Sequence, residues 1–127
     1  MATFNKVNDF VLNAVQTMNL STDQVTLALS NTAPGTETPD PSADGNGILA
    51  NVTEITYTNL SSRDVTTTSS AQAAGTYKLV LTDITLTSSG GSTGPFQYVY
   101  IFDDTTTAPI DALIGFYDYG SALTLND

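Results

Sequence analysis

From residue 25 onwards the sequence places its apolar residues in short runs with a period of two, separated by turn-forming residues. Residues 25–29 form the first run, and residues 96–102 are apolar at both parities. Such alternation is typical of strands, and strands joined by turns pair in antiparallel fashion. A run that is apolar on both sides is typical of a central strand covered on both faces. We expect about seven strands, among them residues 25–29, 65–70, 77–86, 96–102, 112–119 and 123–125. Residues 48–57 are mixed and suit either a short strand or a turn of helix followed by extended chain.

Only the first segment has a helical period. Phe4, Val7, Phe10 and Val11 begin a series of apolar residues at spacings of three and four, which predicts one helix over residues 4–18. The predicted fold is therefore mainly β (α+β), with an N-terminal helix packed on an antiparallel β-sandwich or jelly-roll-like barrel. The apolar stripe of the helix needs a cover, which is either the protein's own sheet or a partner.

The 127 residues are expected to form a single domain. Between the helix and the β region (residues 48–127) lies a Pro/Gly-rich loop over residues 31–47, which is long for a compact domain. Two interpretations remain open: an extended arm that reaches a neighbouring subunit, and a mobile loop. Under both, deletion of residues 36–44 is expected to leave the melting temperature nearly unchanged.

Composition excludes several classes of function. The chain has 13 acidic residues, three basic residues (Lys6, Arg63 and Lys78) and neither Cys nor His. Few cations disfavour binding to nucleic acid or anionic membranes. Without thiol or imidazole, the usual nucleophile–base pairs and zinc sites are excluded. The N-terminus has no continuous apolar run of the kind a signal peptide needs. We therefore expect a protein that is not an enzyme, uses no cofactor or metal, and contacts neither nucleic acid nor membrane.

Acidic residues also offer the best candidate for ion binding. Asp103 and Asp104 end one predicted strand, and Asp111 and Asp118 flank the next. In a hairpin these carboxylates could converge, and calcium prefers oxygen ligands of this kind. However, turns favour aspartate for its local backbone hydrogen bonds, and no calcium-loop spacing is present. The sequence favours turn chemistry.

Tyrosines alternate on two neighbouring predicted strands, at Tyr98, Tyr100, Tyr117 and Tyr119. A large apolar ring with a hydroxyl group suits a half-buried seam or an interface. The same residues could build a stacking face for sugars. Loss of polysaccharide binding on substitution of Tyr98 and Tyr119 would test that alternative.

Several stretches resemble a family of small structural proteins of tailed bacteriophages. They are the opening residues 1–34, the segment Ala74-Gly-Thr-Tyr-Lys-Leu79, the segment Gly94-Pro-Phe-Gln-Tyr-Val-Tyr-Ile-Phe-Asp-Asp104, and residues 113–127. The resemblance implies a virion protein, and the role that suits it best is a decoration (cement) protein that stabilises the outer capsid surface. A further strand is also implied, supplied either by chain beyond residue 127 or by a neighbouring subunit.

Under this interpretation the protein is made in the cytoplasm of the bacterial host. It then binds the major capsid protein and copies of itself. Alternatives are a tail or head-fibre adaptor of the same virion and a small carbohydrate-binding module. The residues expected at an interface are large apolar, aromatic or proline side chains: Phe4, Val7, Phe10, Val11, Pro34, Pro39, Pro41, Tyr98, Tyr100 and Tyr119.

Overall fold

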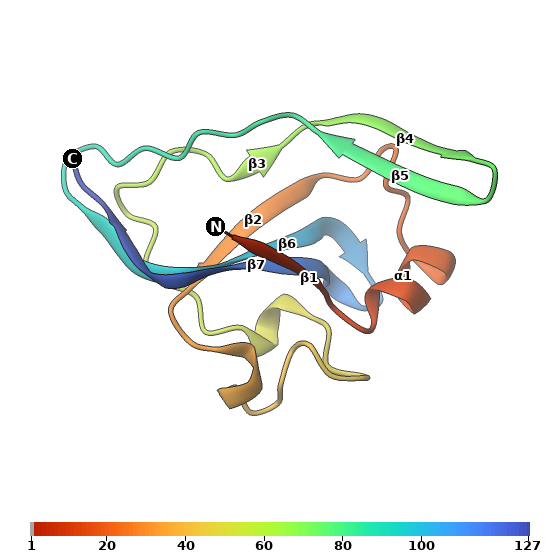
Figure 1. Ribbon diagram of the computed structural model, residues 1–127, viewed down its shortest axis with the longest axis horizontal. Coiled ribbons are helices and arrows are strands. Elements are labelled where there is room, and N and C mark those ends of the chain that lie inside the picture. The colour runs from red at the N-terminus through yellow and green to blue at the C-terminus, as the bar shows by residue number, and fades with distance from the viewer. Residues whose placement is uncertain (1) are drawn as a thin grey trace.

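Two long neighbouring strands, β6 (Thr93–Thr107) and β7 (Ile110–Leu125), form the centre of the fold in the computed structural model, which describes residues 2–127. β2 (Val25–Ser30) and β3 (Asp64–Val65) follow beside β6, and β1 (Thr3–Lys6) pairs with β7. These strands form an antiparallel five-stranded sheet in the order β1-β7-β6-β2-β3 (Figure 1).

A two-stranded hairpin forms the second sheet. Its strands are β4 (Thr67–Ala73) and β5 (Thr76–Leu81), which meet at the tight turn Ala74–Gly75. Both turn residues have positive φ, as short hairpin turns require. The hairpin lies over one face of the large sheet (Figure 1). Sheets of five and two strands with a single α-helix confirm the predicted mainly β fold and are consistent with a sandwich.

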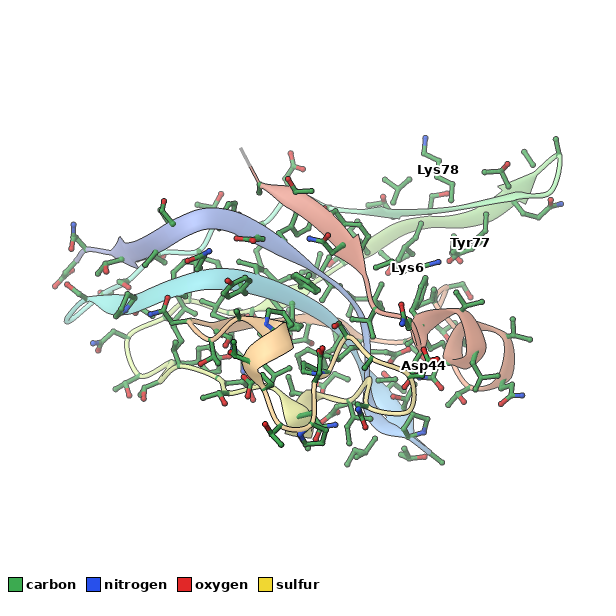
Figure 2. All side chains as sticks on the ribbon, turned by 60° about the horizontal axis from the view of Figure 1, so that its bottom comes forward. Lys6, Asp44, Tyr77 and Lys78 are labelled. Carbon is green, nitrogen blue, oxygen red and sulfur yellow. The ribbon has the colours of Figure 1, made fainter. Side chains whose placement is uncertain are left out.

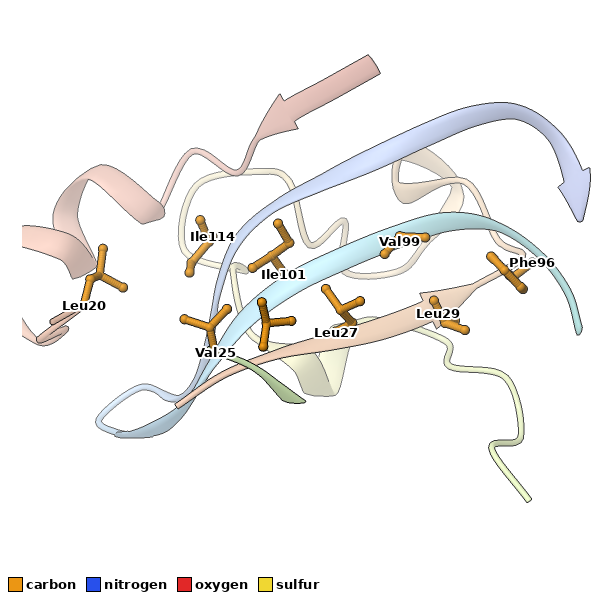
Figure 3. Close-up of a cluster of buried hydrophobic side chains, with 9 residues drawn as sticks. Leu20, Val25, Leu27, Leu29, Phe96, Val99, Ile101 and Ile114 are labelled. Carbon is orange, nitrogen blue, oxygen red and sulfur yellow. The ribbon is translucent and has the colours of Figure 1, made fainter. Parts of the chain in front are cut away.

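The large sheet is buried on both faces, and all six residues of β2 are buried. One face carries a cluster that packs against the hairpin and against partly buried residues of the segments 55–60 and 84–86. Figure 3 shows its members: Leu20, Val25, Leu27, Leu29, Val65, Phe96, Val99, Ile101 and Ile114. The opposite face carries a second cluster: Val7, Ala28, Val52, Tyr98, Tyr100, Phe102 and Leu113. Two-sided burial of residues 96–102 confirms the predicted central strand.

The predicted helix over residues 4–18 is wrong at its N-terminal end. Residues 3–6 form strand β1, and α1 spans only Phe10–Gln16. The segment Thr3–Lys6 has a single apolar residue, Phe4, so its own pattern does not require a helix, and the edge of β7 offers backbone partners for a strand but none for a helix. The amide of Val7 extends this pairing by donating to the carbonyl of Ile114 at 3.1 Å. Tertiary pairing therefore overrides the helical period of the sequence.

The loop 31–47 is packed onto the protein, which contradicts both interpretations made from the sequence. Pro34 and Pro41 are buried, and short 3-10 turns form at η1 (Pro34–Thr36) and, beyond the loop, η2 (Leu49–Asn51). The Asp9 carboxylate accepts hydrogen bonds from the amides of Gly45 and Gly47, both at 2.9 Å. Together with the residues up to Val52, this loop covers the second cluster. The sequence pattern had suggested that the helix packs on the sheet. Deletion of residues 36–44 should therefore lower the melting temperature.

Two predicted strand limits also change. The strand predicted at residues 77–86 ends at Leu81. In the segment 48–57 the structure forms the turn η2 followed by extended chain, which is the second of the two alternatives expected there. The strands predicted at 112–119 and 123–125 are one continuous strand, β7. A glycine at position 120 with φ of 78° lies within β7, so the break that the sequence suggested is a local irregularity of one strand.

Asp9→Ala tests whether the loop is held by this carboxylate. Loss of two hydrogen bonds from backbone amides to a charged acceptor should lower the unfolding free energy by about 2 kcal/mol. For a domain of this size that corresponds to roughly 5–10 °C in melting temperature. Thermal unfolding followed by circular dichroism measures the change. Asp83→Ala is the matched control, since Asp83 is exposed. Equal melting temperatures for the two variants would show that the loop is not anchored there.

Candidate functional site

Helix α1 turns apolar side chains outward and a polar one inward. Val11, Leu12 and Val15 are 53%, 55% and 83% exposed, whereas Asn13 is buried. A surface helix normally shows the opposite arrangement. We call Val11, Leu12 and Val15 the α1 surface. Exposed apolar side chains that gather on one element mark interaction sites more often than scattered ones do.

The orientation of α1 follows from how its ends are fixed. Phe10 at the start of the helix and Met18 after its end pack against the first core cluster. The carbonyl of Asn13 accepts hydrogen bonds from the amides of Thr17 and Met18, both at 2.8 Å, which closes the helix after two turns. The hydroxyl of Thr17 donates to the carbonyl of Ala108 at 3.3 Å. These contacts anchor the ends and leave the α1 surface facing solvent.

Hollows flank α1 on both sides. Between the helix and the hairpin lies a cavity of about 510 Å³, the α1 groove, whose lining includes Lys6, Phe10, Val15 and Tyr77. Figure 2 shows Lys6 and Tyr77 approaching each other from β1 and β5. On the other side of the helix, a hollow of about 630 Å³ is lined in part by Leu12 and Asp44. The α1 surface therefore lies between two recesses, a shape against which a complementary surface can pack.

The interface residues expected from the sequence fall into two groups. Phe4, Val11, Pro39 and Tyr119 are exposed, and Phe10 is half-buried. For the other five the prediction of an interface position is wrong, because their side chains are buried within the protein and cannot reach a partner: Val7, Pro34, Pro41, Tyr98 and Tyr100. The sequence analysis did not single out five further exposed apolar residues: Leu12, Val15, Tyr77, Ile110 and Leu123. Their exposure depends on tertiary packing and has no local signal in the sequence.

The tyrosines lie on opposite faces of the large sheet and do not form one stacking face. Tyr98 and Tyr100 are buried against Phe116, with ring centroids 6.3 and 5.3 Å apart. Tyr117 packs on the other face against Phe4, with centroids 5.1 Å apart. These tyrosines pack against other aromatic rings, as expected for a half-buried seam. They do not form the single face that sugar stacking requires.

The four aspartates named in the sequence do not converge as a group. Asp118 accepts hydrogen bonds from the side chain of Gln97 at 3.0 Å and from the amide of Gly120 at 2.8 Å, which lower its pKa. Partial burial and the neighbouring Asp104 raise the pKa of Asp111. Within residues 2–127, no group of three or more acidic side chains is arranged to hold a metal ion.

Asp103 instead lies beside Asp23, a residue that the sequence did not single out. Asp103 is fully buried, and its Oδ1 atom accepts a hydrogen bond from the amide of Thr105 at 2.9 Å. Its Oδ2 atom is buried and has no hydrogen-bond partner among the described residues, which disfavours the charged form. Burial first, and then the hydrogen bond to Asp23, raise the pKa of Asp103 from 3.8 to about 7.

This carboxyl pair predicts a stability that falls as the pH rises. The folded protein holds the proton more tightly than the unfolded chain, so the stabilising contribution is complete below about pH 4, declines up to about pH 7 and is lost above it. Asp103→Asn should remove this dependence and raise the unfolding free energy at pH 8, on the order of 2 kcal/mol. Urea unfolding from pH 4 to pH 8 measures it. Asp83→Asn controls for net charge, and parallel profiles for all three proteins would contradict the assignment.

Comparison with protein-family models, with curated proteins and with solved structures gave no match. Among the described residues, no helix has both the length and the apolar character to cross a membrane. The geometry of the α1 surface and the charge of the chain are therefore the basis for a functional proposal.

Proposed function

We propose that this protein is a non-enzymatic structural protein of a bacteriophage virion that decorates and stabilises the outer capsid surface. The α1 surface is the observation that carries the proposal. It places three exposed apolar side chains between two recesses at one end of the molecule, where they are free to dock. The resemblance to small phage structural proteins supports the same role.

The charge of the chain favours a partner other than a second free copy. The formal net charge of −10 keeps free copies apart, so docking needs a surface that is neutral or basic around an apolar centre. Acidity also favours a position outside the shell, away from packaged DNA. The major capsid protein is the proposed partner, and contacts between neighbouring copies form only once each is held on the shell.

Copy number in the particle tests the proposal. Quantitative mass spectrometry of purified virions of the phage that encodes this chain should find it in hundreds of copies, at a fixed ratio to the major capsid protein. A dozen copies or fewer would assign it to a tail or head-fibre adaptor. Its absence from the particle would overturn both roles.

Val15→Asp tests the α1 surface. Since Val15 is 83% exposed, the variant should fold with a melting temperature close to that of the wild type. Placing a carboxylate in the docking contact should weaken binding to capsids that lack the protein by tenfold or more, which is about 1.4 kcal/mol. Binding is measured by co-sedimentation with such capsids.

Gln16→Asp is the matched control, because it adds the same charge to the next, exposed position of the same helix. It should bind within about threefold of the wild type, as expected for a charge at the rim of an interface. If Val15→Asp and Gln16→Asp bind equally well, docking does not use the α1 surface.

A further inference from the structure

The two sheets leave a gap between strands β1 and β5. The chain passes from β3 through Thr66 directly into β4. The hairpin β4–β5 that follows packs over the large sheet. Residues of β5 and of β1, an edge strand of the large sheet, line the same cleft, and Figure 2 shows Lys6 and Tyr77 of the two strands near each other. Among the described residues, neither strand has a hydrogen-bonded neighbour on its outer side. Both strands therefore present free backbone N–H and C=O groups.

An apolar cleft of about 320 Å³, the β1–β5 cleft, occupies this gap. Phe4 of β1 lines it from one side, Tyr77, Leu79 and Leu81 of β5 line it from the other, and Tyr117 of β7 contributes to the lining. Phe4 and Tyr77 remain 45% and 47% exposed. Tyr77 also lines the α1 groove, so the two recesses are adjacent. An extended chain laid along β5 would place alternate side chains over these aromatic rings.

Positive charge in this acidic protein is concentrated at the same two strands. Of the three basic side chains, Arg63 is engaged internally, where it donates to the carbonyl of Leu27 and stacks on Tyr57 at 3.8 Å from the ring centroid. Lys6 of β1 lines the α1 groove, whereas Lys78 lies exposed on the face of β5 opposite to Tyr77 and Leu79. Within residues 2–127, no acidic side chain lines either recess. On the side of the cleft, the apolar lining is therefore combined with the positive charge of Lys6.

This charge distribution selects the occupant. Pairing of either edge with the same edge of a second copy would bring lysines together, and lysine on an edge strand opposes such association. A second copy brings a net charge of −10, but its acidic edge strand β3 spans only Asp64–Val65 and is too short to fill the cleft. A segment of a different protein that carries apolar residues at alternate positions and a carboxylate near Lys6 satisfies both features.

We propose that the β1–β5 cleft accepts an extended strand of a partner protein, which pairs with the free edge of β5, fills the cleft with alternate apolar side chains and places a carboxylate beside Lys6. This strand-binding role rests on the proposed docking function and adds the chemistry of the partner segment. Its test uses peptides in solution, so failure of peptide binding and absence from the virion are separate results.

The probe is a fluorescein-labelled peptide of about eight residues that alternates valine with threonine and carries one glutamate. A second peptide has lysine in place of the glutamate, and a third has a central proline, which cannot complete a strand ladder. Fluorescence anisotropy with the full-length protein should show saturable binding of the glutamate peptide. The lysine and proline peptides should bind at least fivefold more weakly.

Two protein variants locate the binding. Tyr77→Asp places a carboxylate in the cleft at a half-exposed position and should weaken binding of the glutamate peptide at least tenfold. Thr76→Asp adds the same charge at the neighbouring exposed position of β5, whose side chain points to the other face, and should bind within about twofold of the wild type. Lys6→Glu should reverse the preference between the glutamate and lysine peptides. Circular dichroism confirms that each variant is folded.

Three results would overturn the proposal. The first is no saturable binding up to about 1 mM peptide, the weak limit of specific recognition. The second is equal binding of the glutamate, lysine and proline peptides, which would show adsorption without a strand ladder or charge recognition. The third is self-association of the wild type in analytical ultracentrifugation that Tyr77→Asp abolishes, because this would assign the cleft to a second copy.

Discussion

The five-stranded sheet must be covered on both faces, and the rest of the structure depends on how a short chain meets that requirement. β2 and the central part of β6 are buried at consecutive positions, so neither face is left to solvent. A helix of seven residues is too small to cover either face. Other segments do so instead. The loop up to Val52 covers one face, and the hairpin together with the segments 55–60 and 84–86 covers the other.

This cover is incomplete near α1 and the hairpin, where Phe4, Val15 and Tyr77 remain exposed. The hairpin has only two strands, so Phe4, Tyr77 and Tyr117 border a cleft rather than a closed core. α1 closes the end of the sheet through Phe10 and Met18 but turns Val15 to solvent. A protein with a net charge of −10 can carry such an end and stay dispersed, because repulsion between copies opposes association through it.

Patterns with a local physical cause can be predicted from the sequence. Residues 96–102 are recognisable as a central strand because a strand that is apolar at both parities must be covered on both faces, and the small-residue turn before Tyr77 marks the hairpin. Residues 3–6 contain one apolar residue, Phe4, which fits a helix or a strand equally, and only the free edge of β7 decides between them. The Asp23–Asp103 pair has no sequence signal, because its members are far apart along the chain and are brought together by tertiary packing.

By itself, the sequence determined a mainly β, antiparallel, strongly acidic protein without thiol or imidazole chemistry, because alternation, turn residues and composition act locally or as simple sums. The tertiary structure alone decided which apolar residues remain outside. Tyr100 is buried while Tyr77 is exposed, although both are tyrosines in predicted strands. The reason is geometric: the number of strands in each sheet and the length of α1 fix how much of the apolar surface the chain can cover.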